Sequence, residues 1–251
     1  MYGMTLLGTG TAVPDADREC THMVWRAPDG PLLIDAGGST YQRLLRADID
    51  PLTLRGVVLT HSHADHINGI PSLLFALKLA GFAGQLPIYG DAPTLALVRR
   101  VLTAFDLEGY QAQVAWTEVQ AGQDLPLANA SYRVRTAPTV HSRPCFGMRF
   151  ETPDGALTYS ADTEPCAAIL ELARGSAALI HEATTPGSFA GHTSPRQAGE
   201  VAAAAGVGRL VLVHFSPKWT MSEAQALAEM RAGGFAGPAS VGREFETIGL
   251  G

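Results

Sequence analysis

The residues with the clearest chemical meaning form one cluster, His61-x-His63-x-Asp65-His66. Three imidazoles and one carboxylate follow directly on the apolar run at 56–59, which we expect to be a strand. So many polar groups at the end of a buried strand are costly unless something coordinates them. Imidazole is a good ligand for Zn, Mn and Fe, and a carboxylate adds a harder ligand. The cluster therefore predicts a transition-metal site.

We expect a short helix to begin near Asp65. Such a helix turns Asp65 and His66 away from the two histidines that precede them. The cluster then provides two pairs of ligands aimed at two adjacent metal sites. The alternative, a surface loop that happens to be rich in histidine, is disfavoured by the positions of the other histidines in the chain.

Three of those other histidines, His141, His181 and His214, fall at or just after the end of an expected strand. Proteins that alternate strands and helices place their ligands at strand ends. His22 lies within an expected early strand, and we interpret it as structural. For His181 a buried core position is favoured over a supporting role beside the metals.

The spacing of the cluster resembles the signature of the metallo-β-lactamase superfamily. Several further segments are similar to its ribonuclease Z branch, so that the resemblance covers nearly the whole chain. These segments are Leu7-Gly8-Thr9-Gly10 with Pro14, Leu33-Ile34-Asp35-Ala36-Gly37, Tyr159-Ser160-Ala161-Asp162-Thr163, His181-Glu182-Ala183-Thr184, Gly191-His192-Thr193-Ser194 and Leu212-Val213-His214-Phe215-Ser216-Pro217.

The resemblance implies a hydrolase with two divalent metal ions, of which Zn is the first expectation and Mn or Fe the alternatives. The implied ligands are His61, His63 and His141 for one ion and Asp65, His66 and His214 for the other, with Asp162 shared by both. Two cations about 3.5–4 Å apart lower the pKa of a shared water, so the bridging hydroxide is the expected nucleophile. The chain has no Gly-x-Ser-x-Gly motif that would point to a serine nucleophile instead.

His192 directly precedes Thr193-Ser194-Pro195, a sequence typical of a helix start, and helix N-termini attract anions. The resemblance implies that His192 protonates the leaving oxygen or stabilises the transition state, and that Glu182 orients it. Asp65, Glu182 and His192 are thus the expected catalytic residues. The alternative for His192 is a residue near the helix cap without chemistry.

Each of three further polar residues near the motifs has two alternative roles. Arg143 lies two positions after His141 and Lys218 four after His214, so both are predicted to contact a substrate phosphate, with ordinary surface solvation as the alternative. Asp35 follows a short apolar run, and either accepts a hydrogen bond from a ligating imidazole or caps the next segment.

Short β-branched runs and amphipathic segments alternate along the chain, which indicates an α/β protein. The resemblance specifies the fold as a four-layer αβ/βα sandwich with two mixed sheets face to face and the metals at one edge. Ser194 and Ser222 each begin a capping-box pattern, and Gly206 is expected to end the first of these helices. No linker or low-complexity run divides the sequence, so we expect one domain over residues 1–251. The expected strands are 5–7, 32–34, 57–60, 87–89, 132–136, 146–151, 157–160, 178–181 and 210–214.

The composition is 46% apolar and 17% charged, with a net charge of −6 and scattered basic residues. No apolar run approaches a membrane span, and the N-terminus lacks the features of a signal peptide, so we expect a cytoplasmic protein. Cys20, Cys145 and Cys166 have no metal-binding spacing and are predicted to be free thiols.

The chain departs from ribonuclease Z proper in one respect. In bacterial forms a protruding arm that grips tRNA lies between the third and fourth metal motifs. Here only two expected strands and a turn separate His141 from Asp162. This favours a phosphodiesterase or nuclease for small phosphodiesters or short nucleic acids, and relatives in this branch are commonly homodimers.

Other functions remain open from the sequence. Arylsulfatases, lactonases and β-lactamases hydrolyse esters or amides on the same scaffold. A metal-binding protein that has lost catalysis is a further alternative, although all seven expected ligands are present. An iron redox protein is disfavoured because His63 is retained where such relatives usually have glutamate.

Overall fold

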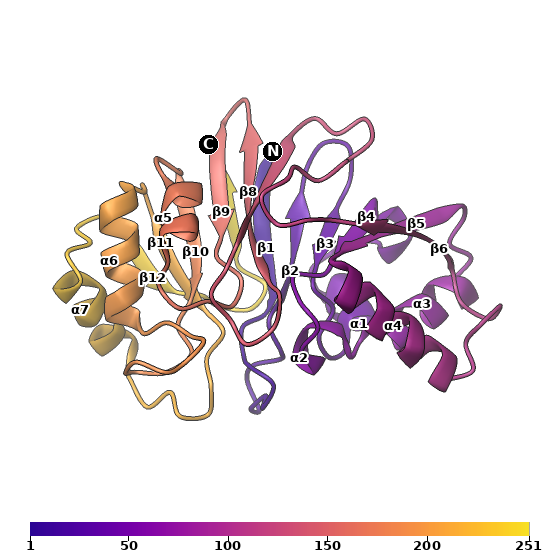
Figure 1. Ribbon diagram of the computed structural model, residues 1–251, viewed down its shortest axis with the longest axis horizontal. Helices are drawn as coiled ribbons and strands as arrows, with labels where there is room; N and C mark the ends of the chain where they lie inside the picture. The colour runs from indigo at the N-terminus through magenta and orange to yellow at the C-terminus, as the bar shows by residue number, and fades with distance from the viewer. Residues whose placement is uncertain (251) are drawn as a thin grey trace.

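The computed structural model describes residues 1–250 as two β-sheets that pack face to face (Figure 1). The first sheet has the strand order β13 (Thr247–Leu250), β1 (Tyr2–Gly8), β2 (His22–Arg26), β3 (Leu32–Ile34), β4 (Gly56–Val58), β5 (Gln85–Gly90), β6 (Gln113–Glu118). The order in the second is β12 (Ala239–Val241), β11 (Leu210–Val213), β10 (Ala178–Glu182), β9 (Gly155–Tyr159), β8 (Phe146–Thr152), β7 (Arg133–Pro138). Strands β3 to β6 and β9 to β12 pair in parallel and the others antiparallel, so both sheets are mixed.

Helices cover the outer face of each sheet, at opposite ends of the view in Figure 1. Those beside the first sheet are α1 (Thr40–Arg46), η1 (Pro51–Thr53), α2 (Ala64–Ile67), α3 (Ile70–Leu79) and α4 (Ala92–Ala104). Those beside the second are α5 (Ala167–Ala173), α6 (Pro195–Ala205) and α7 (Glu223–Ala232). The layers therefore run helix, sheet, sheet, helix, which confirms the four-layer αβ/βα sandwich.

The inner faces of the two sheets share one apolar core. Trp25 of β2 stacks on Phe150 of β8, with ring centroids 4.5 Å apart and an interplanar angle of 26°. Successive strand residues point to opposite faces. In β3, Leu32 and Ile34 therefore face the core between the sheets, while Leu33 packs under the helices. Burial of both faces explains why the interior strands β3, β4 and β11 are continuous apolar runs, whereas the edge strands β7 and β13 alternate buried and exposed residues.

The helix boundaries follow the capping signals in the sequence. Ser194 and Ser222 both form complete capping boxes, and Gly206 ends α6 with a φ of 64°. The strand predicted at 57–60 is shorter than expected, because β4 ends at Val58 and the chain then turns toward the histidine cluster. In residues 1–250 no helix has the length and apolar character needed to cross a membrane.

Candidate metal centre

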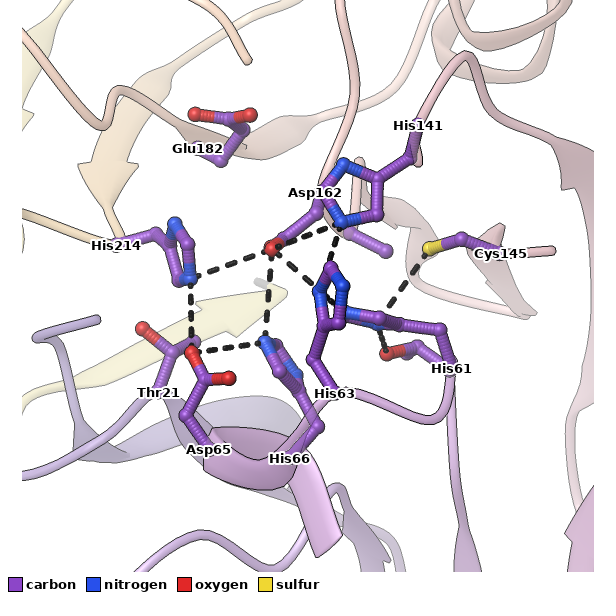
Figure 2. Close-up of polar contacts among 12 residues, drawn as sticks. Thr21, His61, His63, Asp65, His66, His141, Cys145, Asp162, Glu182 and His214 are labelled. Carbon is purple, nitrogen blue, oxygen red and sulfur yellow. Dashed lines mark hydrogen bonds and ion pairs between the residues drawn. The ribbon is translucent and has the colours of Figure 1, made fainter. Parts of the chain in front are cut away.

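All seven predicted metal ligands lie together at one edge of the sandwich (Figure 2). They come from loops that follow strands and from the short helix α2. His61 and His63 follow β4, Asp65 and His66 are in α2, and His141, Asp162 and His214 follow β7, β9 and β11. The predicted helix start near Asp65 is confirmed, and the candidate ligands form two adjacent groups.

The strand ends at this edge have an unusual backbone. Asp35, Ala161 and His214 have φ values of 58°, 52° and 66°, although none of them is glycine. A non-glycine residue in this region costs on the order of 1–3 kcal/mol and persists only where its surroundings determine it. These turns redirect the chain immediately after β3, β9 and β11. Each of the three turns carries a candidate ligand, precedes one or contacts one: His214 is a ligand, Ala161 precedes Asp162, and Asp35 contacts His66.

The first group of candidate ligands surrounds His63. Its Nδ1 lies 3.1 Å from Nε2 of His61 and 3.1 Å from Nε2 of His141. Asp162 Oδ2 lies 3.7 Å from His61 Nε2 and 3.8 Å from His141 Nε2. With metal–nitrogen bonds of about 2.0–2.1 Å, a tetrahedral ion has ligand atoms about 3.4 Å apart. These four distances lie within about 0.4 Å of that value, and all four atoms lie within 4.8 Å of one another, so the group is compact enough to hold one ion.

The ligand atoms of the second group lie at similar distances from one another. Asp65 Oδ2 lies 3.6 Å from Nε2 of His66 and 3.6 Å from Nε2 of His214. Asp162 Oδ2 is 3.6 Å from His66 Nε2 and 3.3 Å from His214 Nε2. A single oxygen atom of Asp162 thus faces both groups, as the centre of Figure 2 shows.

Several of these atoms lack the partners that a buried polar atom needs. His66 Nε2, His214 Nε2 and Asp162 Oδ1 are buried and have no hydrogen-bond partner among residues 1–250. An unsatisfied buried polar atom costs about 1–3 kcal/mol. A divalent cation in each group would satisfy the two histidine nitrogens, so the residues present fit two metal ions.

The remaining nitrogen of each of the five imidazoles has a polar neighbour. The contacts are His66 Nδ1 to Asp35 Oδ2 at 2.7 Å, His214 Nδ1 to Thr184 Oγ1 at 2.9 Å, His141 Nδ1 to the Gly191 carbonyl at 2.8 Å, His61 Nδ1 to Thr60 Oγ1 at 3.0 Å and His63 Nε2 to Ser142 Oγ at 3.3 Å. Such contacts fix the tautomer and the orientation of a ligating histidine. Of the two roles left open for Asp35, the structure supports the hydrogen-bond acceptor.

The electrostatics keep the carboxylate ionised. Burial alone would raise the pKa of Asp162, but the imidazoles of His214 and His66 hold that pKa well below its usual value. Burial and the neighbouring His66 lower the pKa of His61, which is therefore neutral and able to bind a cation. Burial opposes protonation of His66 too, yet the charges of Asp35 and Asp162 raise its pKa well above normal.

Glu182 and His192 lie beside the two groups. His192 Nδ1 donates to Glu182 Oε1 at 2.9 Å, and the Glu182 carboxylate is fully buried. The backbone N–H groups of Thr163 and Thr184 and the Thr184 hydroxyl also donate to Glu182, at 2.8–3.1 Å. The pairing expected for these two residues is present, and Nε2 of His192 has no hydrogen-bond partner among residues 1–250. His192 also lies close enough to Asp162 and His214 to form a third group of possible metal ligands with them.

A cavity of about 340 Å³ opens over the cluster. Its lining is Thr11, Ala12, His63, Ala64, Asp65, Asp162, Thr184, His192 and His214. Arg143 and Lys218 do not line it. Lys218 is exposed, with Nζ 5.5 Å from the ring centroid of Phe189, and Arg143 is exposed without an ion-pair partner in the described part of the chain.

The other histidines and the cysteines named from the sequence lie outside the two ligand groups. His22 and His181 are fully buried, and each bonds a nearby backbone carbonyl through Nδ1. Nε2 of both rings has no hydrogen-bond partner among residues 1–250, but neither histidine lies in a group that could hold a metal ion. Cys20, Cys145 and Cys166 are free thiols, as predicted. Two contacts with the candidate ligands were not predicted: Cys145 Sγ lies 3.7 Å from His61 Nδ1, and Thr184 Oγ1 lies 2.9 Å from His214 Nδ1.

The sequence model of the β-lactamase superfamily domain matches residues 31–215. The chain belongs to this superfamily. Ribonuclease Z of Mycolicibacterium paratuberculosis is 30% identical, with 99% of this chain and 98% of the relative covered. Ribonuclease Z of Mycobacterium sp. strain KMS is 34% identical over 86% of this chain and 85% of the relative. As a member of this superfamily, the chain is a metal-dependent hydrolase.

Solved structures show the same fold over the whole chain. The metallo-β-lactamase fold protein YhfI from Bacillus subtilis has a TM-score of 0.84 at 23% identity and 98% coverage of both chains. A diphosphatase from the PhnP family has a TM-score of 0.81 at 18% identity, with 100% of this chain and 98% of its own covered. The short form of human tRNase Z has a TM-score of 0.78 at 23% identity and 99% coverage of both chains.

We expect Asp162→Ala to lose more bound metal than Asp35→Ala. Asp162 Oδ2 faces both ligand groups, whereas Asp35 acts on His66 and Thr60 alone. Loss of a residue that supports a ligand typically weakens metal affinity about 10–100-fold. Elemental analysis of the purified variants measures the ions per chain, with the exposed Asp124→Ala as a control. Equal loss in the Asp162 and Asp35 variants would contradict the shared position of Asp162.

Proposed function

We propose that this hydrolase is a dinuclear phosphodiesterase, or a ribonuclease Z-like nuclease, that acts on small phosphodiesters. The observation that carries this proposal is the pair of Glu182 and His192 beside a cavity lined by both ligand groups. The names of the relatives, ribonuclease Z in each case, support a phosphodiester as the substrate class. The fold alone would not select it, because one fold hosts many reactions.

The cluster residues act by holding two divalent ions, for which Zn is the first choice and Mn or Fe the alternatives. We assign His61, His63 and His141 to one ion, Asp65, His66 and His214 to the other, and Asp162 to both. When bound, such a pair supplies an activated water and charge stabilisation at the phosphoryl oxygens. Asp65 is then catalytic only through the ion that it holds.

His192 completes the reaction at the leaving group. Hydrolysis breaks a P–O bond with water as the nucleophile, so the leaving oxygen must gain a proton. We assign this proton to Nε2 of a protonated His192, whose Nδ1–H stays bonded to Glu182. The buried Glu182 carboxylate stabilises the imidazolium and fixes the ring, as acidic partners of catalytic histidines do.

The expected substrate is small because no long extension separates His141 from Asp162. Between His141 and Asp162 lie only β8, a turn and β9. The protein has 24 acidic and 18 basic residues, so its net charge of −6 does not offset the phosphates of a large folded RNA. We propose that Arg143 and Lys218 provide the local positive charge for a substrate phosphate.

We also propose a homodimer in the cytoplasm. The resemblance to the ribonuclease Z branch supports the dimer. The three free thiols fit a reducing compartment.

Substrate class is tested by assaying one metal-loaded preparation on several substrates. We expect turnover of bis(p-nitrophenyl) phosphate and of nucleotide diesters, with loss of activity after chelation and recovery with added metal. An aryl sulfate, a lactone, a β-lactam and a precursor tRNA complete the panel. Efficient cleavage of the tRNA with none of the small diesters would overturn the proposed substrate size. Turnover of the sulfate, lactone or β-lactam alone would overturn the substrate class.

His192→Ala should separate proton donation from charge stabilisation. We expect kcat to fall roughly 10²–10⁴-fold for diesters with alkoxide leaving groups, the usual scale of general acid catalysis, while metal content is unchanged. The loss should be smaller for p-nitrophenolate, which hardly needs a proton. An identical loss for both leaving groups would show that His192 stabilises charge without donating a proton.

A further inference from the structure

An exposed aromatic side chain stands next to the proposed catalytic histidine. The ring of Phe189 lies nearly parallel to that of His192, with centroids 5.8 Å apart and an interplanar angle of 28°. His192 is in turn nearly parallel to His214, at 5.5 Å and 21°. The rings of His214, His192 and Phe189 thus form a row from a candidate metal ligand to the protein surface, where Phe189 is 50% exposed to solvent.

The loop that carries Phe189 is fixed to the cluster at both ends. At one end, the Gly191 carbonyl accepts from His141 Nδ1 at 2.8 Å, and Gly191 N–H donates to Glu164 at 2.7 Å. At the other end, Thr184 accepts from His214 Nδ1 at 2.9 Å. The backbone N–H of His192 also donates to the Phe189 carbonyl at 3.0 Å. The position of Phe189 is therefore defined relative to both ligand groups.

The ammonium group of Lys218 lies over this ring. Its Nζ is 5.5 Å from the Phe189 centroid, and the Ser216 N–H ties its loop to the Thr184 carbonyl at 3.1 Å. Cations also lie over the less exposed rings of Phe215, Phe245 and Trp116. Of the strongly exposed aromatic side chains in the described part of the chain, Phe105 and Tyr110 have no ring or cation against them. The half-exposed Phe189 ring, with a flexible ammonium group that can move from the ring to an anion, matches a ligand that has both a planar ring and a phosphate.

We propose that Phe189 is the stacking platform for a nucleobase of the substrate, and that Lys218 contacts a phosphate of the same nucleotide. This inference rests on the proposed phosphodiesterase function and narrows its substrates to nucleotides. A base presents a flat π-face whatever its sequence, so stacking on Phe189 gives affinity for nucleotides without selecting one base. A diester that carries only alkyl groups gains nothing comparable from the ring.

Binding to the metal-loaded protein tests the platform without any turnover. Adenosine 5′-monophosphate and ribose 5-phosphate differ only in the base, and calorimetry measures both affinities. We expect the wild type to prefer the nucleotide by roughly 5- to 150-fold, the range of one base–aromatic stack. Phe189→Ala and Phe189→Leu should abolish the preference, while Phe189→Tyr and the control Phe105→Ala retain it. Lys218→Met should weaken both ligands to a similar extent.

Kinetics then separate stacking from an indirect effect through His192. Adenosine 2′,3′-cyclic phosphate and 1-O-methylribose 2′,3′-cyclic phosphate present the same reacting phosphorus with and without a base. We expect Phe189→Leu to raise KM for the adenosine substrate alone and to leave kcat unchanged for both.

Each outcome has a distinct meaning. A similar fall in kcat for both cyclic substrates would show that Phe189 only positions His192 and would overturn the inference. Equal affinity of the wild type for the two monophosphates would also overturn it, even if diesters are hydrolysed. Preference for the nucleotide that depends on Phe189, without hydrolysis of any diester, would support the platform and refute the proposed function.

Discussion

The structure depends most on one buried anion, the carboxylate of Asp162. Its Oδ2 faces nitrogen atoms of four histidines at 3.3–3.8 Å. An ionised carboxylate without compensating charge is among the most expensive groups to bury. The raised pKa of His66 lets its imidazolium supply part of the compensating charge, and two divalent cations would supply that charge in its place. The histidine nitrogens and the carboxylate oxygens of this site therefore need bound positive charge to compensate their burial.

The fold supplies the rigidity that this arrangement needs. The ligands come from both sheets, and the apolar core between the sheets, with Trp25 stacked on Phe150, fixes their relative position. Local strain at Asp35, Ala161 and His214 then directs the chain at the strand ends. Backbone strain of this kind is sustained because the surroundings determine it, which is common at functional sites. Stability in the core thus permits a strained and polar edge.

Much of the fold and the ligand set could be predicted, because the signals are local. The His61 to His66 cluster and the capping serines Ser194 and Ser222 act over a few residues, and the resemblance supplied the distant ligands. The strands β6, β12 and β13 were not predicted. In β12 three half-buried residues lack the apolar run that marks an interior strand. Edge strands of this kind are recognised only through their pairing partners.

Roles stayed open, and contacts went unpredicted, where a residue depends on a partner that is distant in the sequence. Asp35 could not be assigned from its own segment, because the atom that it contacts, His66 Nδ1, is 31 positions away. Thr184 reaches His214 across 30 positions and Cys145 reaches His61 across 84. Phe189 reads as an ordinary loop residue in the sequence. Only the folded chain brings its ring beside His192.

The most direct test of a dinuclear centre is a crystal structure of the metal-loaded protein with anomalous diffraction data at the metal edge. We expect two peaks about 3.5–4 Å apart, the separation usual for paired catalytic metals. One should lie among His61, His63 and His141, the other among Asp65, His66 and His214, with Asp162 bound to both. A single fully occupied peak, or two peaks of which only one contacts Asp162, would contradict it.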